Sequence, residues 1–297
     1  MKDRIALLGT GLMGTPMGER LLASGFNLTV WNRSSHKTET LQRKGARVAD
    51  TPALAAQGAD CVIAMLAHGP AVTEVLTDGG VADAMSRDSL FVDMSSIPPE
   101  TARAHAAMLS SRNIAALDAP VSGGVVGAAA GTLAIMVGGE AEGYARALPI
   151  FAALGHATRV GPAGAGALAK LANQLIVGIT IGAVAEALLL ARVGGADPEA
   201  VRDAIRGGFA ESRVLALHGE RMLQRNFLPG AHAATQLKDL NSALQEAEAA
   251  GLTLPLTQKV CDLYQSFVEE GGALLDHSAL LVALERLNSV KVPAAGG

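Results

Sequence analysis

The pattern of apolar residues changes near residue 161. Before that point, short apolar runs typical of strands alternate with patterns typical of helices; strands are expected at residues 4–8, 27–31, 60–66, 89–92, 114–117 and 132–137, and helices at 13–23, 35–44, 52–56 and 98–110. This alternation predicts an α/β domain with a doubly wound parallel sheet. Only helical patterns follow, at residues 166–194, 198–205, 214–225, 235–250, 255–270 and 277–287. We therefore expect a second, all-helical domain, joined to the first by a long helix.

A glycine-rich turn follows the first predicted strand and opens the first predicted helix. It reads Gly9-Thr10-Gly11-Leu12-Met13-Gly14, the GxGxxG pattern in the context that dinucleotide binding requires. Its glycines permit a tight turn, a close approach to a pyrophosphate and packing of helix on strand, and the helix N-terminus favours the anion. We therefore predict a Rossmann-type domain over residues 1–163 whose turn residues bind NAD or NADP; the alternative is a turn without a ligand. The helical domain then spans residues 164–292, and residues 293–297 form a frayed tail.

The residues after the second predicted strand indicate which dinucleotide is preferred. An acidic side chain there would bind the adenosine ribose of NAD, but this chain has Asn32, followed by Arg33 and Ser34. A guanidinium and a hydroxyl suit a 2′-phosphate. We therefore predict that NADP is preferred over NAD and that these residues contact the cofactor. The alternative is a basic loop that is merely solvated.

Lys170 is an isolated charge in a long apolar stretch. Asn173 and Gln174 follow at three and four positions along the same predicted helix, so the polar side chains share one face. Desolvation disfavours the charged amine, which makes a buried lysine a usable proton donor. Gly164 and Gly166 let the backbone before the lysine pass close to another group. The alternative is a lysine whose head reaches water.

Another candidate segment, Ser122-Gly123-Gly124, follows the predicted strand that ends at Leu117. It lies at the edge where open α/β sheets bind ligands, and a hydroxyl with successive glycine N–H groups can form a nest for a carboxylate. An ordinary turn explains the segment equally well. A lysine–aspartate pair near the start of a later predicted helix would usually be solvated.

Composition and charge argue against several partners. The chain has 49% apolar residues, 18% charged residues and a formal net charge of −4, so it lacks the basic surface that nucleic acid or anionic membrane would require. Its 2 cysteines form no CxxC pair and its 7 histidines no short metal-binding spacing, so no metal site is expected. Residues 119–139 are too rich in glycine, and residues 175–185 too few, to span a membrane. With no secretory cleavage pattern near the N-terminus, we expect a cytoplasmic protein.

Four motifs occur together in one order: the turn at residues 9–17, DAPVSGG at 118–124, GAGALAK at 164–170 and KDL at 238–240. In this order they resemble the β-hydroxyacid dehydrogenase family over nearly the whole chain. Residues 170–174, 204–208, 225–230 and 276–280 resemble the branch of that family that reduces tartronate semialdehyde.

The resemblance implies a set of catalytic and substrate-binding residues: Lys170, Asn173 and Ser122 as catalytic residues, with Gly123, Gly124 and Gln174 beside them. The lysine would donate a proton, the serine and glycines would hold the substrate carboxylate, and the asparagine would orient the substrate or the lysine. This branch has glutamine after that asparagine, where other branches place a further asparagine.

The resemblance also implies cofactor contacts at Leu66, Ser96 and Lys238. Asp239 is expected in the substrate site, holding one of the two lysines in position. The chain departs from the branch at His232, where the branch often has an arginine after a bulky aromatic residue. His232 is therefore a candidate replacement cation or donor for the substrate, or else a solvated loop histidine, so the exact substrate stays open.

The function that the resemblance implies is NADPH-dependent reduction of a small 3-oxo acid, reversible as a 3-hydroxyacid dehydrogenase, with tartronate semialdehyde and D-glycerate as the leading pair. The rivals are a reductase of succinic semialdehyde or glyoxylate, a 3-hydroxyisobutyrate dehydrogenase, an imine reductase and a non-catalytic NADP-binding module. Imine reductases generally lack the lysine, so Lys170 argues against them. The long apolar helix, rich in glycine and alanine, predicts a homodimer or homotetramer.

Overall fold

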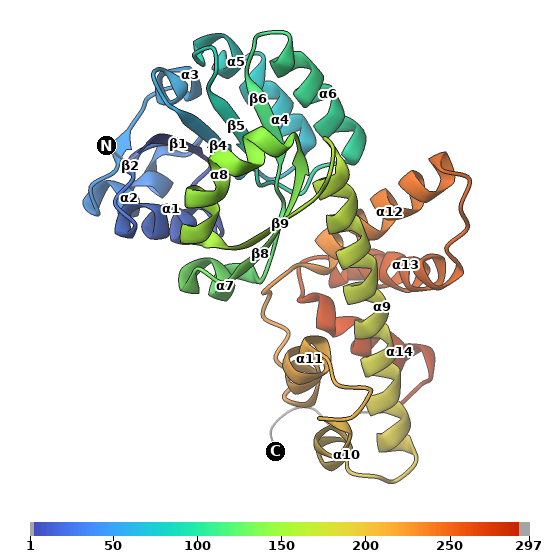
Figure 1. The fold of residues 1–297 in the computed structure, drawn as a ribbon. Helices are drawn as coiled ribbons and strands as arrows, with labels where there is room; N and C mark the ends of the chain where they lie inside the picture. The colour runs from blue at the N-terminus through green and yellow to red at the C-terminus, as the bar shows by residue number, and fades with distance from the viewer. Residues whose placement is uncertain (1–2, 291–297) are drawn as a thin grey trace. The chain divides into compact units, whose positions relative to one another are not determined.

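The computed structural model describes residues 3–290 (Figure 1). The chain divides into two compact units, Met1–Lys170 and Leu171–Gly297. The long helix α9, Ala165–Val193, begins in the first unit and continues in the second. The predicted domain boundary after residue 163 stands just before this helix, and the predicted tail at residues 293–297 lies outside the described residues.

The first unit is built on a nine-stranded sheet. Its parallel part has the order β3-β2-β1-β4-β5-β6, formed by β1 (Arg4–Leu8), β2 (Asn27–Trp31), β3 (Arg47–Val48), β4 (Cys61–Ala64), β5 (Leu90–Asp93) and β6 (Ala115–Asp118). Beyond β6, strand β8 (Leu133–Gly139) runs antiparallel to β6 and to β7 (Val121–Ser122), and β9 (Gly155–Gly161) runs parallel to β8. The predicted doubly wound parallel sheet is confirmed, with a mixed edge.

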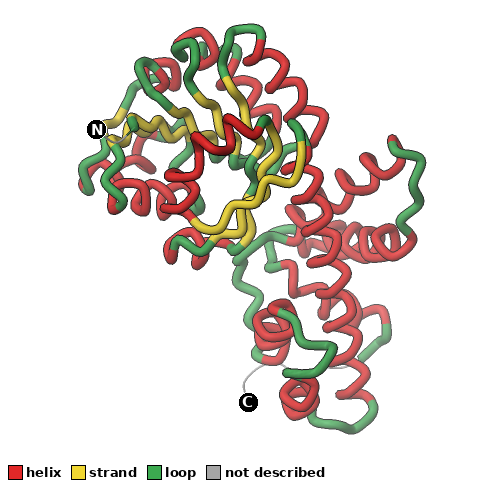
Figure 2. The backbone as a smooth tube through the Cα atoms, viewed as in Figure 1, coloured by secondary structure: helices red, strands yellow, loops and turns green. Residues whose placement is uncertain are grey.

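Helices cover both faces of this sheet (Figure 2). Alternate residues of β1 explain why: Ile5 and Leu7 belong to a buried core shared with α1 and α8, and Ala6 and Leu8 to a second core shared with α3, α4 and α6. The helices are α1 (Gly14–Ala23), α2 (Glu39–Arg43), α3 (Pro52–Ala56), α4 (Gly69–Leu76), α5 (Val81–Ala84), α6 (Pro99–Ser110), α7 (Gly124–Ala130) and α8 (Ala141–Leu154).

Several strands and helices of the first unit were not predicted from the sequence. Strands β3 and β7 have two residues each, and β9 is largely exposed, so none of them forms an apolar run. Helices α4, α5, α7 and α8 were not predicted either; α7 is rich in glycine, a poor helix former. The helix predicted at residues 35–44 is broken into a 3-10 helix, η1 (Ser35–Thr38), and α2.

The second unit is helical over its described residues, 171–290, apart from one isolated bridge between His232 and Asp276 (Figure 2). Ile181 of α9 packs in its core with Leu240 and Tyr264. The elements after α9 are α10 (Pro198–Ile205), α11 (Arg213–Leu223), α12 (Ala233–Ala249), α13 (Pro255–Phe267), a π-helical turn η2 (Val268–Gly272), a 3-10 turn η3 (His277–Ala279) and α14 (Leu280–Leu287). The six predicted helices are confirmed, although two of them include these tighter or wider turns.

Residues 175–185 were expected to be too few to cross a membrane. That expectation is wrong, because these residues lie inside the 29-residue helix α9. By length and composition alone this helix could cross a membrane; its most apolar window has a mean hydropathy of 2.0 and is 39% buried. The core helix of a soluble protein passes the same test, and Val184 and Leu188 of α9 are buried in the core of the second unit. That no membrane is bound stays a prediction.

Candidate active site

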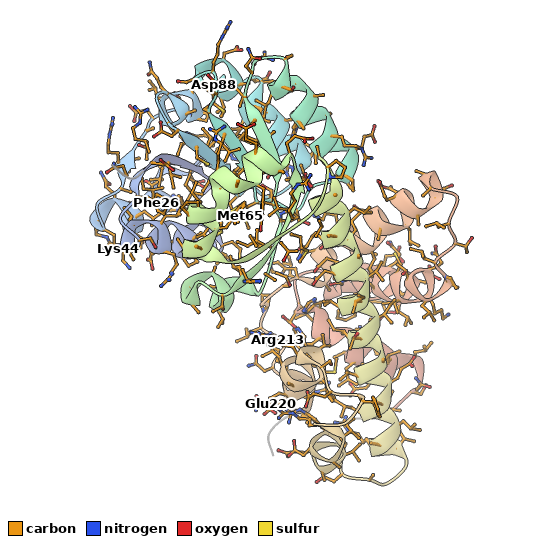
Figure 3. All side chains as sticks on the ribbon, viewed as in Figure 1. Phe26, Lys44, Met65, Asp88, Arg213 and Glu220 are labelled. Atoms are coloured by element: carbon orange, nitrogen blue, oxygen red, sulfur yellow. The ribbon has the colours of Figure 1, made fainter. Side chains whose placement is uncertain are left out.

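The glycines of the dinucleotide turn are required by close backbone packing. Gly9 has a φ of 103°, and a side-chain carbon there would lie 2.2 Å from the carbonyl oxygen of Met65, a residue labelled in Figure 3. A side-chain carbon on Gly14 would lie 1.9 Å from the Gly9 oxygen. By contrast, one on Gly11 would meet nothing within 4 Å, so the backbone there borders open space, as the close approach of a pyrophosphate requires.

Asn32 ties this turn to the loop after β2. Its Oδ1 accepts a hydrogen bond from the Thr10 backbone N at 3.0 Å, and its Nδ2 donates to the Ser34 carbonyl at 3.0 Å. The side chain expected to meet the cofactor's ribose is therefore already engaged in holding the turn. Arg33 is exposed, and its guanidinium pairs with none of the residues that the structure describes.

The other side chains of the turn differ in their surroundings. Leu12 is 79% exposed, whereas Met13 is partly buried against the core under α1. The hydroxyl oxygen of Thr10 is buried and has no hydrogen-bond partner within residues 3–290. An orphaned buried polar atom next to Gly11, whose backbone borders open space, fits a turn that receives a polar ligand.

Leu66 and Ser96, the predicted cofactor contacts, follow β4 and β5 at the same sheet edge. The Leu66 backbone N donates to Ser95 Oγ at 2.9 Å, and the Ser95 backbone N donates to Asp93 Oδ1 at 2.9 Å. Asp93 and Ser95 were not predicted, although Asp93 and Asp118 end adjacent strands and lie opposite each other in register. Burial raises the pKa of Asp93 to about 7, hydrogen bonds with Ser95 oppose the rise, and Asp118 adds to it.

Asp118 anchors the beginning of α9 at the end of β6. Its Oδ1 accepts a hydrogen bond from the Gly164 backbone N at 2.8 Å, and its Oδ2 accepts one from the Ala167 backbone N at 2.7 Å. A side-chain carbon on Gly166 would lie 2.3 Å from the Asp118 carbonyl oxygen. The predicted close passage of backbone at these glycines is confirmed. Burial raises the pKa of Asp118, and the amide hydrogen bonds oppose the rise.

This anchor places Lys170 beside the Ser122 segment. Lys170 is half-buried, and its Nζ donates a hydrogen bond to the Val121 carbonyl at 3.0 Å, so its head is not simply solvated. The Ser122 hydroxyl has no hydrogen-bond partner among the described residues. Gly123 and Gly124 have φ values of 134° and 62°, and α7 begins at Gly124, so amides of its first turn lack acceptors within the helix.

In the second unit, a chain of hydrogen bonds and one ion pair connects four other predicted site residues: Asn173, Gln174, Asp239 and Lys238. Asn173 Nδ2 donates to Gln174 Oε1 at 2.9 Å, and Gln174 Nε2 donates to Asp239 Oδ2 at 2.8 Å. Asp239 Oδ1 pairs with Lys238 Nζ at 3.1 Å. The expectation of a merely solvated pair is wrong for Asp239, which is 3% exposed. Asn173 and Gln174 follow Lys170 on one face of α9.

His232 is not a free loop side chain. It is half-buried directly before α12, and its Nδ1 lies 2.9 Å from the Leu274 carbonyl oxygen in a hydrogen bond. Its backbone also pairs with Asp276 in the isolated bridge. The structure therefore gives its ring one partner within the second unit, and any contact with substrate stays a prediction.

The fold brings together histidines whose sequence spacing gave no sign of contact. His218 Nε2 lies 3.2 Å from His277 Nε2, and Asp276 completes a group whose potential ligand atoms lie within 4.8 Å of one another. The Asp276 carboxylate, however, already accepts hydrogen bonds from the N and Oγ of Ser278, the amides of Gly230 and Ala231, and Arg221. Although burial opposes it, the nearby His218, 3.7 Å away, and hydrogen bonds from Ser278 hold the pKa of Asp276 well below its usual range. These contacts account for the Asp276 carboxylate, and the expectation that no metal is bound stays a prediction.

The first parallel strands of the first unit thus end in the dinucleotide turn and the loop that carries the unpaired guanidinium of Arg33. The beginning of α9 places Lys170 beside the Ser122-Gly123-Gly124 segment. Open α/β sheets bind their ligands at this edge. This fold and this edge define the class of NAD(P)-dependent oxidoreductases.

Comparisons with known proteins narrow the class. Residues 4–163 match the NAD binding domain of 6-phosphogluconate dehydrogenase, and residues 164–284 match the domain described as NAD-binding of NADP-dependent 3-hydroxyisobutyrate dehydrogenase. The chain is 43% identical, over 97% of its length and 99% of the relative's, to 2-hydroxy-3-oxopropionate reductase of Escherichia coli K12. A structure of Mycobacterium tuberculosis 3-hydroxyisobutyrate dehydrogenase with L-serine has a TM-score of 0.87 at 34% identity, covering 96% of this chain and 99% of that one.

A third comparison concerns the cofactor. Psf3 in complex with NADP+ and 2-OPP has a TM-score of 0.85 at 25% identity, covering 94% of this chain and 99% of that one. The chain belongs to the 3-hydroxyisobutyrate dehydrogenase-like family, the β-hydroxyacid dehydrogenases, and is an NAD(P)-dependent enzyme of that family.

Proposed function

We propose that the chain reduces a small 3-oxo acid to the 3-hydroxyacid with NADPH, reversibly, and that tartronate semialdehyde and D-glycerate are its substrate pair. The observation that carries the proposal is the position of the Lys170 amine. Its nitrogen lies 3.0 Å from the carbonyl oxygen of Val121, the residue directly before Ser122. A cationic donor next to an unengaged hydroxyl and to Gly124, which borders open space, suits a substrate that has both a carbonyl and a carboxylate.

The residues of the chain divide the chemistry between them. Lys170 donates a proton to the oxygen of the carbonyl as that oxygen becomes an alkoxide. Ser122, Gly123 and Gly124 hold the carboxylate and thereby fix the direction in which the carbonyl faces. Asn173, on the same face of α9, orients the substrate or the lysine. When bound, the nicotinamide cofactor supplies the hydride that the carbonyl carbon accepts.

The residues of the first unit fit a dinucleotide. The turn at residues 9–14 borders open space at Gly11, and Thr10 has a buried hydroxyl with no partner among the described residues. We propose that NADPH is preferred because Arg33 has an exposed, unpaired guanidinium that can pair with a 2′-phosphate, while no acidic side chain follows β2 to bind a ribose.

The choice of tartronate semialdehyde is supported by the 43% identity with an Escherichia coli enzyme named for this reaction. Succinic semialdehyde, glyoxylate and 3-hydroxyisobutyrate are the competing substrates, and His232 marks the place where this chain departs from that branch. Lys170 argues against an imine reductase and, with Asn173, against a non-catalytic NADP-binding module.

The experiment is a panel of small semialdehydes and ketoacids, each assayed with NADPH and with NADH by the loss of absorbance of the reduced cofactor. We expect the highest kcat/KM for tartronate semialdehyde with NADPH. A higher kcat/KM for another acid would replace the substrate, and tight cofactor binding without turnover of any acid would favour the non-catalytic module.

We also propose that the enzyme is a cytoplasmic homodimer or homotetramer. Support for the oligomer comes from the α9 stripe, a set of exposed apolar residues on α9 in the second unit: Ala172, Ile176, Ala183, Ala187 and Leu190, with one charged residue, Glu186, exposed beside them. Apolar rows of this length on a surface usually meet another protein.

A further inference from the structure

One polar side chain on the buried face of α12 has no role in the proposed chemistry. Gln236 is 1% exposed and lies among the buried residues Ala233, Leu237 and Leu240 of the same helix. An amide buried among apolar side chains is costly unless both of its ends find hydrogen-bond partners. Both ends of the Gln236 amide have partners, and these partners lie in different parts of the second unit, on α9 and at His277.

The nitrogen end of this amide reaches the main chain of α9. Gln236 Nε2 donates a hydrogen bond to the Gln174 carbonyl oxygen at 3.0 Å. That oxygen is an acceptor inside a helix, and a carbonyl has a second lone pair for such a donor. The contact depends on a glycine, because a side-chain carbon on Gly178 would lie 2.8 Å from Gln236 Nε2.

The oxygen end of the amide faces the histidine cluster. Gln236 Oε1 lies 3.3 Å from His277 Nδ1, and an amide oxygen can only accept, so His277 carries its proton on Nδ1. His277 Nε2 faces His218 Nε2 at 3.2 Å. The Gln174 carbonyl oxygen can only accept, so it fixes which way round the Gln236 amide is held, with the N–H group toward α9 and the oxygen toward His277.

Gln236 contacts Gln174, and the side chain of Gln174 in turn holds Asn173. The Gln174 side chain accepts a hydrogen bond from Asn173 and donates one to Asp239. A shift of the Gln174 backbone would therefore move the Asn173 amide without touching it directly.

We infer that Gln236 is a positioning residue: with its oxygen end held by His277, it holds the Gln174 backbone so that Asn173 presents its amide to the substrate. The inference rests on the proposed function for the role of Asn173. Cofactor binding does not depend on this link, because the dinucleotide turn belongs to the first unit.

Two substitutions weaken the contact between Gln236 and the Gln174 carbonyl from its two sides. Gln236→Met keeps the length of the side chain but removes its donor and acceptor. Gly178→Ala keeps the amide but places a carbon in its path, while improving the helix propensity of α9. For each variant we expect kcat for the semialdehyde to fall about three- to tenfold, the usual effect of one neutral hydrogen bond, with the Kd for NADPH unchanged.

Each variant has a matched control. Gly182→Ala lies one turn further along α9, where a side-chain carbon would meet only ordinary contacts, the nearest at 3.6 Å to Val260. Tyr264→Phe removes a buried hydrogen bond to the His277 carbonyl and so costs stability in the same region without touching Gln174. Both controls should keep the kcat of the wild-type enzyme.

Amide hydrogen exchange of the intact enzyme gives a readout that does not depend on turnover. Exchange in α9 around Gln174 should be faster in Gln236→Met and unchanged in Tyr264→Phe. Unchanged exchange in Gln236→Met, or a kcat that falls no further than in Tyr264→Phe, would overturn the inference. If the wild-type enzyme reduces no acid of the panel, the proposed function fails, and the exchange comparison alone decides whether Gln236 holds this part of α9.

Discussion

At the scale of single residues, a buried carboxyl group makes stability depend on pH. Asp93 is 3% exposed, and its Oδ2 has no partner among the described residues. Burial raises its pKa to about 7 in the folded protein, against about 3.9 in an unfolded chain. As the pH rises between these values, the unfolded chain releases a proton that the folded protein retains, so the free energy of unfolding falls through this window.

Asp93→Asn should remove this dependence. As the pH rises from about 4.5 to about 7.5, the urea midpoint of the wild-type protein should fall, and that of the variant should fall less. The loss in free energy of unfolding over this range should be roughly 1–3 kcal/mol smaller in the variant. Asp88→Asn is the control, because Asp88, labelled in Figure 3, is exposed and loses the same charge. Parallel pH profiles for wild type and Asp93→Asn would show that this carboxyl group does not titrate as described.

The choice of cofactor also depends on one residue. Arg33→Ala should weaken NADPH binding about ten- to a hundredfold, because the guanidinium would lose a charged hydrogen-bonding partner that NADH does not have. The measurement is the Michaelis constant for each cofactor with the same acid. Equal changes for NADPH and NADH would make Arg33 a general loop residue.

At the scale of elements, the catalytic proposal depends on how α9 begins. Gly166→Ala would place a carbon 2.3 Å from the Asp118 carbonyl oxygen, so the start of α9 must move away from β6. We expect a loss of about 1–3 kcal/mol in stability, which outweighs the gain in helix propensity, together with a lower kcat because Lys170 follows on the same helix. Thermal unfolding and steady-state kinetics measure the two effects; a variant as stable and active as wild type would show that this packing is not required.

The elements also show what a sequence can predict. Strands β1 and β2 have the predicted bounds, because β1 contains a run of buried apolar residues and β2 alternates the buried Leu28 and Val30 with more exposed residues, each beside a turn. Strand β9 could not be predicted, since its residues are mostly exposed and it exists only through pairing with β8. The glycine-rich turn and Lys170 could be proposed from the sequence because their motifs are local, and their roles stay predictions. The contact of His218 with His277 joins residues 59 positions apart, so only the packing of the second unit reveals it.

At the scale of the whole molecule, the α9 stripe predicts self-association. Leu190 is 74% exposed on this stripe, so Leu190→Glu should leave the folded chain intact while introducing a charge into an apolar contact. We expect a smaller assembly by size-exclusion chromatography with light scattering. Leu287→Glu is the control, because Leu287 is 71% exposed and lies outside the stripe. An unchanged mass for Leu190→Glu would mean that subunits do not meet on this face.

The central claim is that Lys170 donates the proton. The measurement is kcat/KM of Lys170→Ala for the preferred semialdehyde with NADPH, beside the Kd for NADPH measured by fluorescence. We expect kcat/KM to fall by about two to four orders of magnitude, the scale of a positioned proton donor, with the Kd unchanged. Turnover close to that of the wild-type enzyme would contradict the account.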